Sequence, residues 1–248
     1  MKIDLDLQEG KVEAALASAR EFARARGADI SADEAEGDVL LAAKRFDDAG
    51  AAYTKAHRTK PSGSLAIKLF KANRAAGSPH PEEGLIKWVV ANPSDLAARQ
   101  FLAGYYQASA QPKLALAEYE QMLRQRPDDP AVLNNLAWLV QESDQKRARK
   151  LAQHAYELAP GRPEIADTYG WILVQMGEVK QALSVLESAL KSAPGNGDIQ
   201  YHVAMARAQN GDRASATAMM KQLLASDTAF ASRPQAEQFL KNLQSEGA

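Results

Sequence analysis

The side chains that most often hold metals or transfer protons are few and scattered in this sequence. The histidines are His57, His80, His154 and His202, and no two of them stand three or four residues apart, the spacing that places two ligands on one helical face. There is no cysteine, which excludes thiolate nucleophiles, thiolate metal ligands and disulfides. We therefore expect no metal site, and we interpret each histidine as a surface residue or a residue packed between helices.

Paired carboxylates are another arrangement that suggests chemistry, because glycosidases work with two of them. The acidic pairs at 82–83 and 128–129 stand beside prolines, where a turn ends or a helix begins and a carboxylate favours the helix dipole. Residues 4–10 (DLDLQEG) resemble the start of a calcium loop but lack the acidic residue at its twelfth position. No phosphate-binding, serine hydrolase or zinc protease motif occurs. The sequence predicts a chain that is not an enzyme and requires no cofactor.

Composition narrows the kinds of partner. The 248 residues carry 30 lysines and arginines against 31 aspartates and glutamates, a net charge of −1, which argues against nucleic-acid binding. The one basic cluster, 146–150 (KRARK), is interpreted as a solvated helix face. No apolar stretch approaches the roughly 20 residues that a membrane span needs. We expect an alanine-rich, helical protein.

A period of 33 or 34 residues organises the chain. Pro93, Pro127, Pro160 and Pro194 follow one another at intervals of 34, 33 and 34 residues, and one more interval of 34 reaches Thr228. An alanine stands twelve residues before each of the last four positions, and another small residue stands eleven or twelve residues before that alanine. With the equivalent pair upstream, the alanines are Ala49, Ala115, Ala148, Ala182 and Ala216, and the earlier residues are Gly37, Ala103, Ala137, Gly170 and Ala204.

Each unit of this pattern predicts two antiparallel helices, helix A followed by helix B. The small residues mark where the two backbones approach closely, and the proline ends the unit because it cannot continue a helix. Gly177 and Gly211 fall in the turn between the two helices, where a left-handed residue is often needed. The 33-residue unit has one residue fewer between Ala137 and Ala148, so we expect its deletion in that turn, around 142–146.

These residues resemble the tetratricopeptide repeat (TPR), a 34-residue helix–turn–helix with Gly or Ala on helix A, Ala on helix B and a closing Pro. Residues 134–140 (NNLAWLV) and 167–183 (DTYGWILVQMGEVKQAL) are particularly similar to family members. The resemblance covers about 30–228, and 62–95 departs from it because a bulky residue replaces the small one. It implies an all-α fold, a right-handed α-solenoid of stacked antiparallel helix pairs (the TPR superhelix).

The repeat divides the chain into eight segments. They are 1–29 (a partial repeat with an N-terminal helix), 30–61 (TPR-like), 62–95 (degenerate), 96–129, 130–162, 163–196 and 197–228 (TPR repeats), and 229–248 (a C-terminal capping helix and tail). Residues 11–26 read as a helix B without a complete helix A before it. A repeat cannot bury its apolar face alone, so we expect the native protein to continue upstream. Self-association through this partial repeat is an alternative use of the same apolar face.

Two C-terminal stretches carry a narrower resemblance. Residues 199–212 (IQYHVAMARAQNGD) and 223–243 (LLASDTAFASRPQAEQFLKNL) look like the C-terminal part of the TPR-repeat lipoproteins of the PEP-CTERM/exosortase system. Those proteins accompany bacterial exopolysaccharide gene clusters. The resemblance implies a periplasmic or outer-membrane-anchored lipoprotein and a role in exopolysaccharide or envelope assembly.

The TPR resemblance also implies a binding surface, because certain positions of helix A line the concave groove of family members. Carried residue by residue onto this chain, those positions are Gln100, Gln107, Asn134, Trp138, Gln141, Asp167, Trp171, Gln175, Tyr201, Met205 and Gln209. Trp138 and Trp171 hold the same position in adjacent repeats, so we expect them to be neighbours, flanked by Tyr201 and Met205. An aromatic strip edged by amides is typical of a hot spot for a protein or peptide partner.

Other interpretations of this strip stay open. Aromatic rings and amides also suit sugar rings, so the chain could be a carbohydrate-binding module that takes a polysaccharide. Trp138 and Trp171 could instead pack as core between neighbouring A helices. The chain could also be the docking arm of a larger enzyme. The Lys and Asn clamp with which some TPR domains grip a partner's C-terminal carboxylates is not apparent in the segments from 96 to 228.

Overall fold

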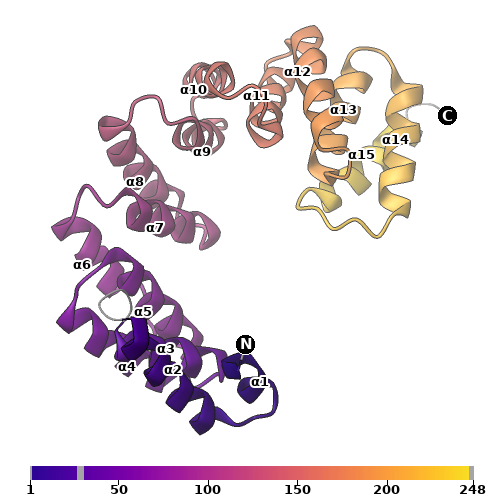
Figure 1. Cartoon of the computed structure of the whole chain (residues 1–248). Coiled ribbons are helices and arrows are strands. Elements are labelled where there is room, and N and C mark those ends of the chain that lie inside the picture. Colours follow the sequence, from indigo (N-terminus) through magenta and orange to yellow (C-terminus); the bar gives the residue numbers. More distant parts are fainter. Residues whose placement is uncertain (1, 27–30, 246–248) are drawn as a thin grey trace. The chain divides into compact units, whose positions relative to one another are not determined.

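The computed structural model describes residues 2–26 and 31–245, and these form fifteen α-helices without a strand (Figure 1). The helices are α1 Lys2–Gln8, α2 Val12–Arg26, α3 Ala32–Ala42, α4 Phe46–Thr59, α5 Gly63–Ala75, α6 Glu83–Ala91, α7 Leu96–Ala108, α8 Pro112–Gln125, α9 Pro130–Val140, α10 Gln145–Leu158, α11 Pro163–Gln175, α12 Val179–Ser192, α13 Gly197–Gln209, α14 Arg213–Ala225 and α15 Arg233–Ser245. The prediction of an all-α solenoid of antiparallel helix pairs is confirmed.

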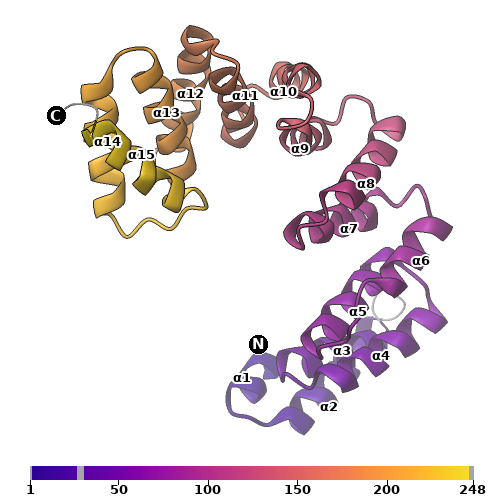
Figure 2. The same cartoon turned by 180° about the vertical axis from the view of Figure 1, so that it is seen from behind.

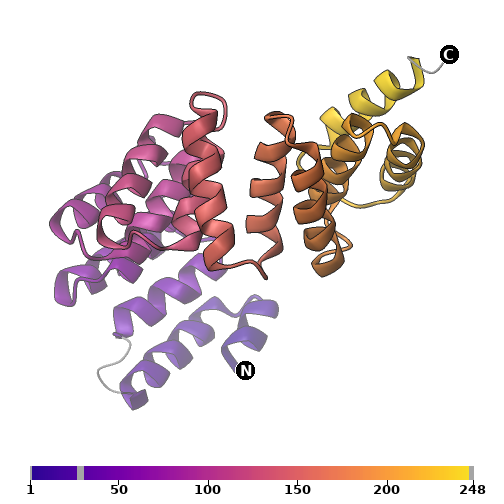
Figure 3. The same ribbon diagram turned by 90° about the horizontal axis from the view of Figure 1, so that it is seen from above.

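The helices fall into two compact units, Met1–Glu118 and Tyr119–Ala248, with the boundary inside α8. In the first unit each helix from α1 to α6 packs on the next one along the chain, so that α6 packs on α7. In the second unit α9 to α15 do the same, and α11 also touches α9 and α13. The consecutive pairing of α11 to α14 can be followed from two opposite sides and from above (Figures 1, 2 and 3).

Side-chain caps start many of these helices. The Asp129 carboxylate accepts hydrogen bonds from the backbone N–H groups of Ala131 and Val132, and Pro130 follows it at the first helical position. The acidic pair 128–129 therefore includes a helix cap, as its place after a proline indicated. At the other acidic pair, Lys87 bonds to Glu83 in the first turn of α6 and lowers the pKa of that carboxyl.

Most turns between helix A and helix B contain a residue in the left-handed backbone conformation. Gly177 and Gly211 have φ of +76° and +92°, and Ala110 takes the same kind of conformation at +55°. The turn between α9 and α10 has no positive-φ residue among the described residues, and it lies in the unit of 33 residues. The missing residue is therefore the left-handed one, within the turn where the spacing predicted a deletion.

The small residues lie where helix A meets helix B. A Cβ added to Gly170 would come within 2.5 Å of Leu186 Cγ on the partner helix, and one added to Gly37 would come within 2.5 Å of the Tyr53 ring. Alanine fills the equivalent position in the other repeats, and Ala103, Ala137 and Ala204 are completely buried. Close packing at these points leaves no space for a larger side chain.

The degenerate segment 62–95 still forms two helices, α5 and α6. Buried Phe70 occupies the position of the small residue, and its ring packs edge-on against Phe101 and Tyr105 of α7. Helix α6 begins at Glu83 and is only nine residues long. The bulky residue is accommodated by packing on the next A helix rather than by a close contact within its own pair.

The two ends of the chain have different helices. A seven-residue α1 precedes α2, which covers the residues expected to form a helix B. At the other end, α15 packs Leu243 and Phe239 on a cluster that contains Tyr201 and Met220. The first residue of the segment 30–61 and the tail after Ser245 lie outside the described residues. No helix within the described ranges combines the length and apolar composition needed to cross a membrane.

Alanine substitutions at two helical glycines, one in the seam between helix A and helix B and one outside it, should have opposite effects on stability. Gly170→Ala should lower the free energy of unfolding by about 1–3 kcal/mol, because the new methyl group overlaps Leu186. Gly104→Ala is the matched control, because Gly104 is helical and nothing lies within 4 Å of its added Cβ. The control should raise stability by about 0.5–1 kcal/mol. Urea denaturation measures both, and a neutral Gly170→Ala would contradict the close approach.

Candidate functional site

The predicted binding residues lie on four A helices. Helix α7 carries Gln100 and Gln107, α9 carries Asn134 and Trp138 with Gln141 directly after its last residue, α11 carries Asp167, Trp171 and Gln175, and α13 carries Tyr201, Met205 and Gln209. The residues on α9, α11 and α13 belong to the second unit, where α11 touches both other helices, and we call them the A-helix face. Gln100, which is exposed, and Gln107, which is half-buried, belong to the first unit and are not part of this face.

Trp138 is the large apolar side chain that the A-helix face presents to solvent. Its side chain is 41% exposed, which is unusual for a residue of this size in a packed helical repeat. Asn134 lies one turn before it on α9, and Gln141, the C-cap residue of α9, lies three residues after it. By this spacing the indole ring and both amides share one side of the helix.

The two amides next to Trp138 are less accessible than the sequence suggested. Gln141 is buried, with 6% of its surface exposed, and Asn134 is half-buried. Asn134 Oδ1 and Gln141 Oε1 each lack a hydrogen-bond partner within the described structure. Gln141, the residue that follows the last residue of α9, therefore does not present its side chain at the surface as expected. Buried polar atoms without partners are costly, so these oxygens mark a locally destabilised part of the face.

Trp171 packs between helices rather than facing solvent. Its ring stacks on the imidazole of His202, with ring centroids 4.3 Å apart and planes inclined by 21°. Nδ1 of His202 lies 2.7 Å from Oδ1 of Asp167, so the imidazole donates a hydrogen bond to that carboxylate. His202 is 3% exposed. Asp167, Trp171 and His202 thus form a connected cluster between α11 and α13.

Tyr201 and Met205 also contribute to packing. Tyr201 is 7% exposed, its ring is 6.1 Å from that of Phe239 on α15, and burial raises the pKa of its phenol. Met205 packs against the same cluster. Tyr201 therefore does not flank an open groove, because α15 covers this end of the A helices. Gln175 and Gln209, the last residues of α11 and α13, are exposed, and their place in a binding groove stays a prediction.

The equivalent tryptophans have different surroundings. Trp138 and Trp171 lie on helices that touch, but no ring contact between them occurs among the described residues. His202 on α13 stacks on Trp171. The residue that holds the same repeat position on α11, the helix that follows α9, is Thr168, which has no aromatic ring. The interpretation of these residues as core therefore fits Trp171, and the interpretation as surface fits Trp138.

His202 is the residue of this site whose role sequence reasoning did not identify. The sequence placed it only at the surface or between helices. The sequence separation of Asp167 and His202 could have indicated their contact. They are 35 residues apart, one more than the 34-residue repeat, so they hold adjacent positions on neighbouring A helices. No group of acidic and histidine residues able to hold a metal occurs among the described residues.

The basic cluster 146–150 lies away from this face, on α10. Arg147 pairs with Glu120 at 2.8 Å, and Nε and Nη2 of Arg149 donate to the two carboxylate oxygens of Glu178, each at 3.0 Å. These pairs are half-exposed contacts between helices. The A-helix face itself carries one acidic group, Asp167, which His202 already engages. The A-helix face therefore presents apolar and neutral polar side chains rather than a cluster of charges.

Comparisons with known proteins agree with this architecture. Two family models, both described as tetratricopeptide repeat, match the chain over residues 1–64 and 173–243, together more than half of it. A TPR repeat-containing protein of Pseudomonas aeruginosa is 29% identical over an alignment of 157 residues, with coverages of 57% of this chain and 25% of that protein. The chain therefore spans about a quarter of the length of the curated relative it matches.

Solved structures share the fold at low sequence identity. A tetratricopeptide repeat protein from Parabacteroides merdae has a TM-score of 0.61 at 12% identity and covers 98% of this chain and 96% of its own. YrrB, a TPR protein with an unusual peptide-binding site, has a TM-score of 0.55 at 20% identity, with coverages of 71% and 92%. The Cut9–Hcn1 assembly of the APC/C reaches 0.63 at 16% identity, with coverages of 86% and 42%.

The buried pair in this site predicts a measurable coupling. In a double-mutant cycle with Asp167→Ala and His202→Ala, the coupling energy should be about 1–2 kcal/mol, because each single variant leaves a buried polar partner. Arg162 and Glu164 form the control pair in the same unit, since both are about half exposed. Their coupling should stay below about 0.5 kcal/mol. Equal couplings in urea denaturation would contradict a structural role for the His202 contact.

Proposed function

Because this chain belongs to the tetratricopeptide-repeat family, we propose that it is a non-catalytic scaffold that binds a partner protein or peptide on the A-helix face of its second unit. The TPR fold is consistent with a protein-interaction scaffold, and the A-helix face is the surface that we assign to the partner. The observation that carries it is Trp138, a tryptophan exposed on helix A of a packed repeat. An indole in this position offers a large apolar area at small conformational cost, as interface hot spots do.

The surroundings of Trp138 support a peptide as the ligand. Half-buried Asn134 lies one turn before Trp138 on the same helix, and its side-chain carbonyl oxygen has no hydrogen-bond partner within the described structure. Rotation of this amide would offer it to the backbone of a bound peptide, which would supply the missing donor. YrrB, which shares the fold, is a TPR protein with a peptide-binding site, and this likeness adds support to a peptide ligand.

Trp171 and its contacts provide the rigid support for this surface. The stack on His202 and the hydrogen bond to Asp167 hold α11 against α13, next to α9. We therefore assign partner contact to Trp138 and a positioning role to Trp171. Replacing both tryptophans at once would combine loss of binding with loss of packing, so the test uses Trp138 alone.

A polysaccharide ligand is the second candidate for the same residues. A solvent-facing indole with nearby amides would stack on a sugar ring and hydrogen-bond its hydroxyl groups. The neutral character of the A-helix face suits an uncharged glycan as well as a peptide. Titration with exopolysaccharide fragments, followed by tryptophan fluorescence, separates the two, because only a glycan ligand would change the emission without any protein partner.

The cellular context is part of the proposal. The likeness of residues 199–212 and 223–243 to PEP-CTERM-system TPR lipoproteins supports a role in bacterial exopolysaccharide or envelope assembly, outside the cytoplasm. The curated relative is about four times as long as the matched part. Within a longer protein, this chain would serve as the arm that docks a partner.

Trp138→Ala should weaken capture of the protein partner at least about tenfold and leave helical content unchanged, because hot-spot tryptophans typically contribute 2 kcal/mol or more. Leu158→Ala is the matched control, since Leu158 is 43% exposed on α10 of the same unit but lies on a B helix. The partner would first be identified by capture from the source bacterium and then titrated against both variants. Unchanged binding by a folded Trp138→Ala variant would refute the assignment of this surface.

A further inference from the structure

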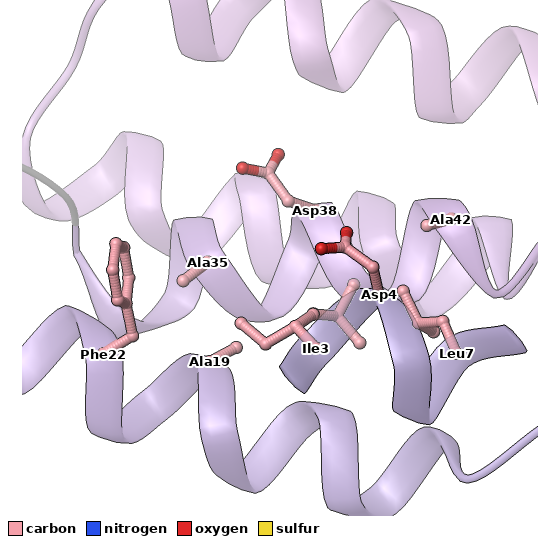
Figure 4. Close-up of a pocket in the computed structure, with 9 residues that line it drawn as sticks. Ile3, Asp4, Leu7, Ala19, Phe22, Ala35, Asp38 and Ala42 are labelled. Atoms are coloured by element: carbon pink, nitrogen blue, oxygen red, sulfur yellow. The ribbon is translucent and has the colours of Figure 1, made fainter. Parts of the chain in front are cut away.

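The cavity of the first unit between α1, α2 and α3 gives no indication of an occupant. It has a volume of about 240 Å³, and Figure 4 shows Ile3 and Phe22 among the side chains that line it. The Asp38 carboxylate on its lining accepts hydrogen bonds from Lys68 at 2.7 and 2.8 Å and from the Tyr53 hydroxyl at 2.8 Å. This charge is therefore neutralised within the unit. A reactive group that is not engaged in this way lies in the second unit, at one end of α13.

The sequence Asn-Gly-Asp occurs twice in the chain, once at each end of α13. Asn196 directly precedes the helix and Asn210 directly follows it, and each stands before a glycine and an aspartate. Asparagine is a thermolabile residue, and a following glycine favours its deamidation because glycine has no side chain to hinder attack by its own backbone nitrogen. Since the residues that follow are the same at both sites, a difference in their reactivity has to come from the structure.

Asn196 is held at the start of the helix. Its Oδ1 accepts hydrogen bonds from the backbone N–H groups of Asp198 at 3.0 Å and Ile199 at 3.2 Å, which makes it the N-cap. Gly197 is buried, and a Cβ added to it would lie 2.6 Å from Cγ of Phe230. Attack by the Gly197 nitrogen would therefore require loss of the cap and displacement of an aromatic ring.

Asn210 lies in an open turn. Asn210 and Gly211 are both exposed, and nothing lies within 4 Å of a Cβ added to Gly211. Within the described part of the chain the Asn210 side chain makes no hydrogen bond. Its backbone is held by local bonds at the end of α13, from Asn210 N–H to Ala206 O and from Gly211 N–H to Ala208 O, each 3.0 Å long. Exposed bonds at a helix end are among the first to open.

The dipole of α13 acts in the opposite direction. Its positive end lies at Asn196, so the dipole by itself would favour the anion formed during attack there. Water and salt screen this effect at exposed positions. Asn196 would have to give up its cap, the Phe230 contact and the hydrogen bonds that Asp198 accepts from the backbone N–H groups of residues 231 and 232, at 3.3 and 2.8 Å. These contacts together outweigh the dipole.

We propose that Asn210 is a site of spontaneous deamidation in the folded chain and that Asn196 is protected. The Gly211 nitrogen loses its proton to water and attacks Cγ of Asn210, so a new C–N bond closes a succinimide ring. The bond from Cγ to the amide nitrogen breaks, and ammonia leaves after taking up one proton. Water then adds to one of the ring carbonyls and reopens the ring as aspartate or isoaspartate. In sum, one amide and one water become one carboxylate and one ammonium ion.

Either product changes the turn that joins α13 to α14. A carboxylate there faces the negative end of the α13 dipole. Isoaspartate also adds one carbon to the backbone before Gly211, which has φ of +92°, and before Asp212, which caps α14 and bonds through its N–H to Arg207 O at 2.9 Å. Deamidation therefore weakens the joint between two packed helices. The function proposed for Trp138 is independent of this reaction.

Peptide mapping by mass spectrometry tests the proposal within one sample of the whole chain. In mildly alkaline buffer Asn210 should deamidate at least about fivefold faster than Asn196, the factor that one helix cap of typical strength supplies. In concentrated urea the two rates should become similar, because the following residues are the same. Equal rates in the folded chain, or faster reaction at Asn196, would overturn the proposal. A difference that persists unchanged in urea would do so too.

A substitution tests the cause of the protection. Phe230→Ala should uncover Gly197 and accelerate deamidation at Asn196, with the rate at Asn210 unchanged. Phe46→Ala is the matched control, because it removes another half-buried ring, in the first unit. Acceleration at Asn196 by both variants, or by neither, would contradict protection by the Phe230 contact.

The effect on the fold is measured by urea denaturation of aged samples. After prolonged incubation the unmodified chain should unfold at a lower urea concentration than the fresh chain does. Asn210→Ser removes the reacting amide at an exposed position and should keep its original midpoint. An equal loss in this variant would place the damaging reaction elsewhere and overturn the proposal. Because these readouts need no partner, failure of the function proposed for Trp138 would remain distinguishable.

Discussion

The close approach of helix A and helix B at a residue without a bulky side chain is the contact on which each repeat depends. At Gly170 and Gly37 the partner's side chain occupies the space that a Cβ would need. Where alanine suffices, as at Ala137 and Ala204, its methyl group is completely buried. A solenoid has no core common to the whole chain, so each helix pair must bury its apolar side chains in its own seam and against the next pair.

This seam determines which residues remain for function. Helix B covers one side of each helix A, and neighbouring A helices cover the flanks, so a single face is left to solvent. Trp138 lies on such a face. Trp171 has the same position in the repeat, but α13 supplies His202 to cover it, and α15 then covers Tyr201. The exposure of equivalent residues thus changes along the solenoid because their neighbours change.

Polar contacts between successive A helices hold these neighbours in place. Lys68 of α5 joins Glu34 and Asp38 of α3, and His202 of α13 joins Asp167 of α11. Each contact spans 30 to 35 residues, close to one repeat. Burial strengthens such contacts and makes their loss costly. The second of them also supports the surface proposed to bind a partner, because His202 on α13 contacts α11, the helix that packs next to α9 and Trp138.

The sequence by itself determined the helix pairs, the small residues in their seams, the Asp129 cap and the turn that lost a residue. These features are local or strictly periodic, so spacing alone reveals them. Tertiary structure decided that Trp138 is exposed and Trp171 covered, that Gln141 and Tyr201 are buried, and that Ala19, Ala35 and Ala42 leave a cavity beside two carboxylates. Exposure and empty space depend on the side chains of neighbouring helices, and a pattern within one helix does not contain that information.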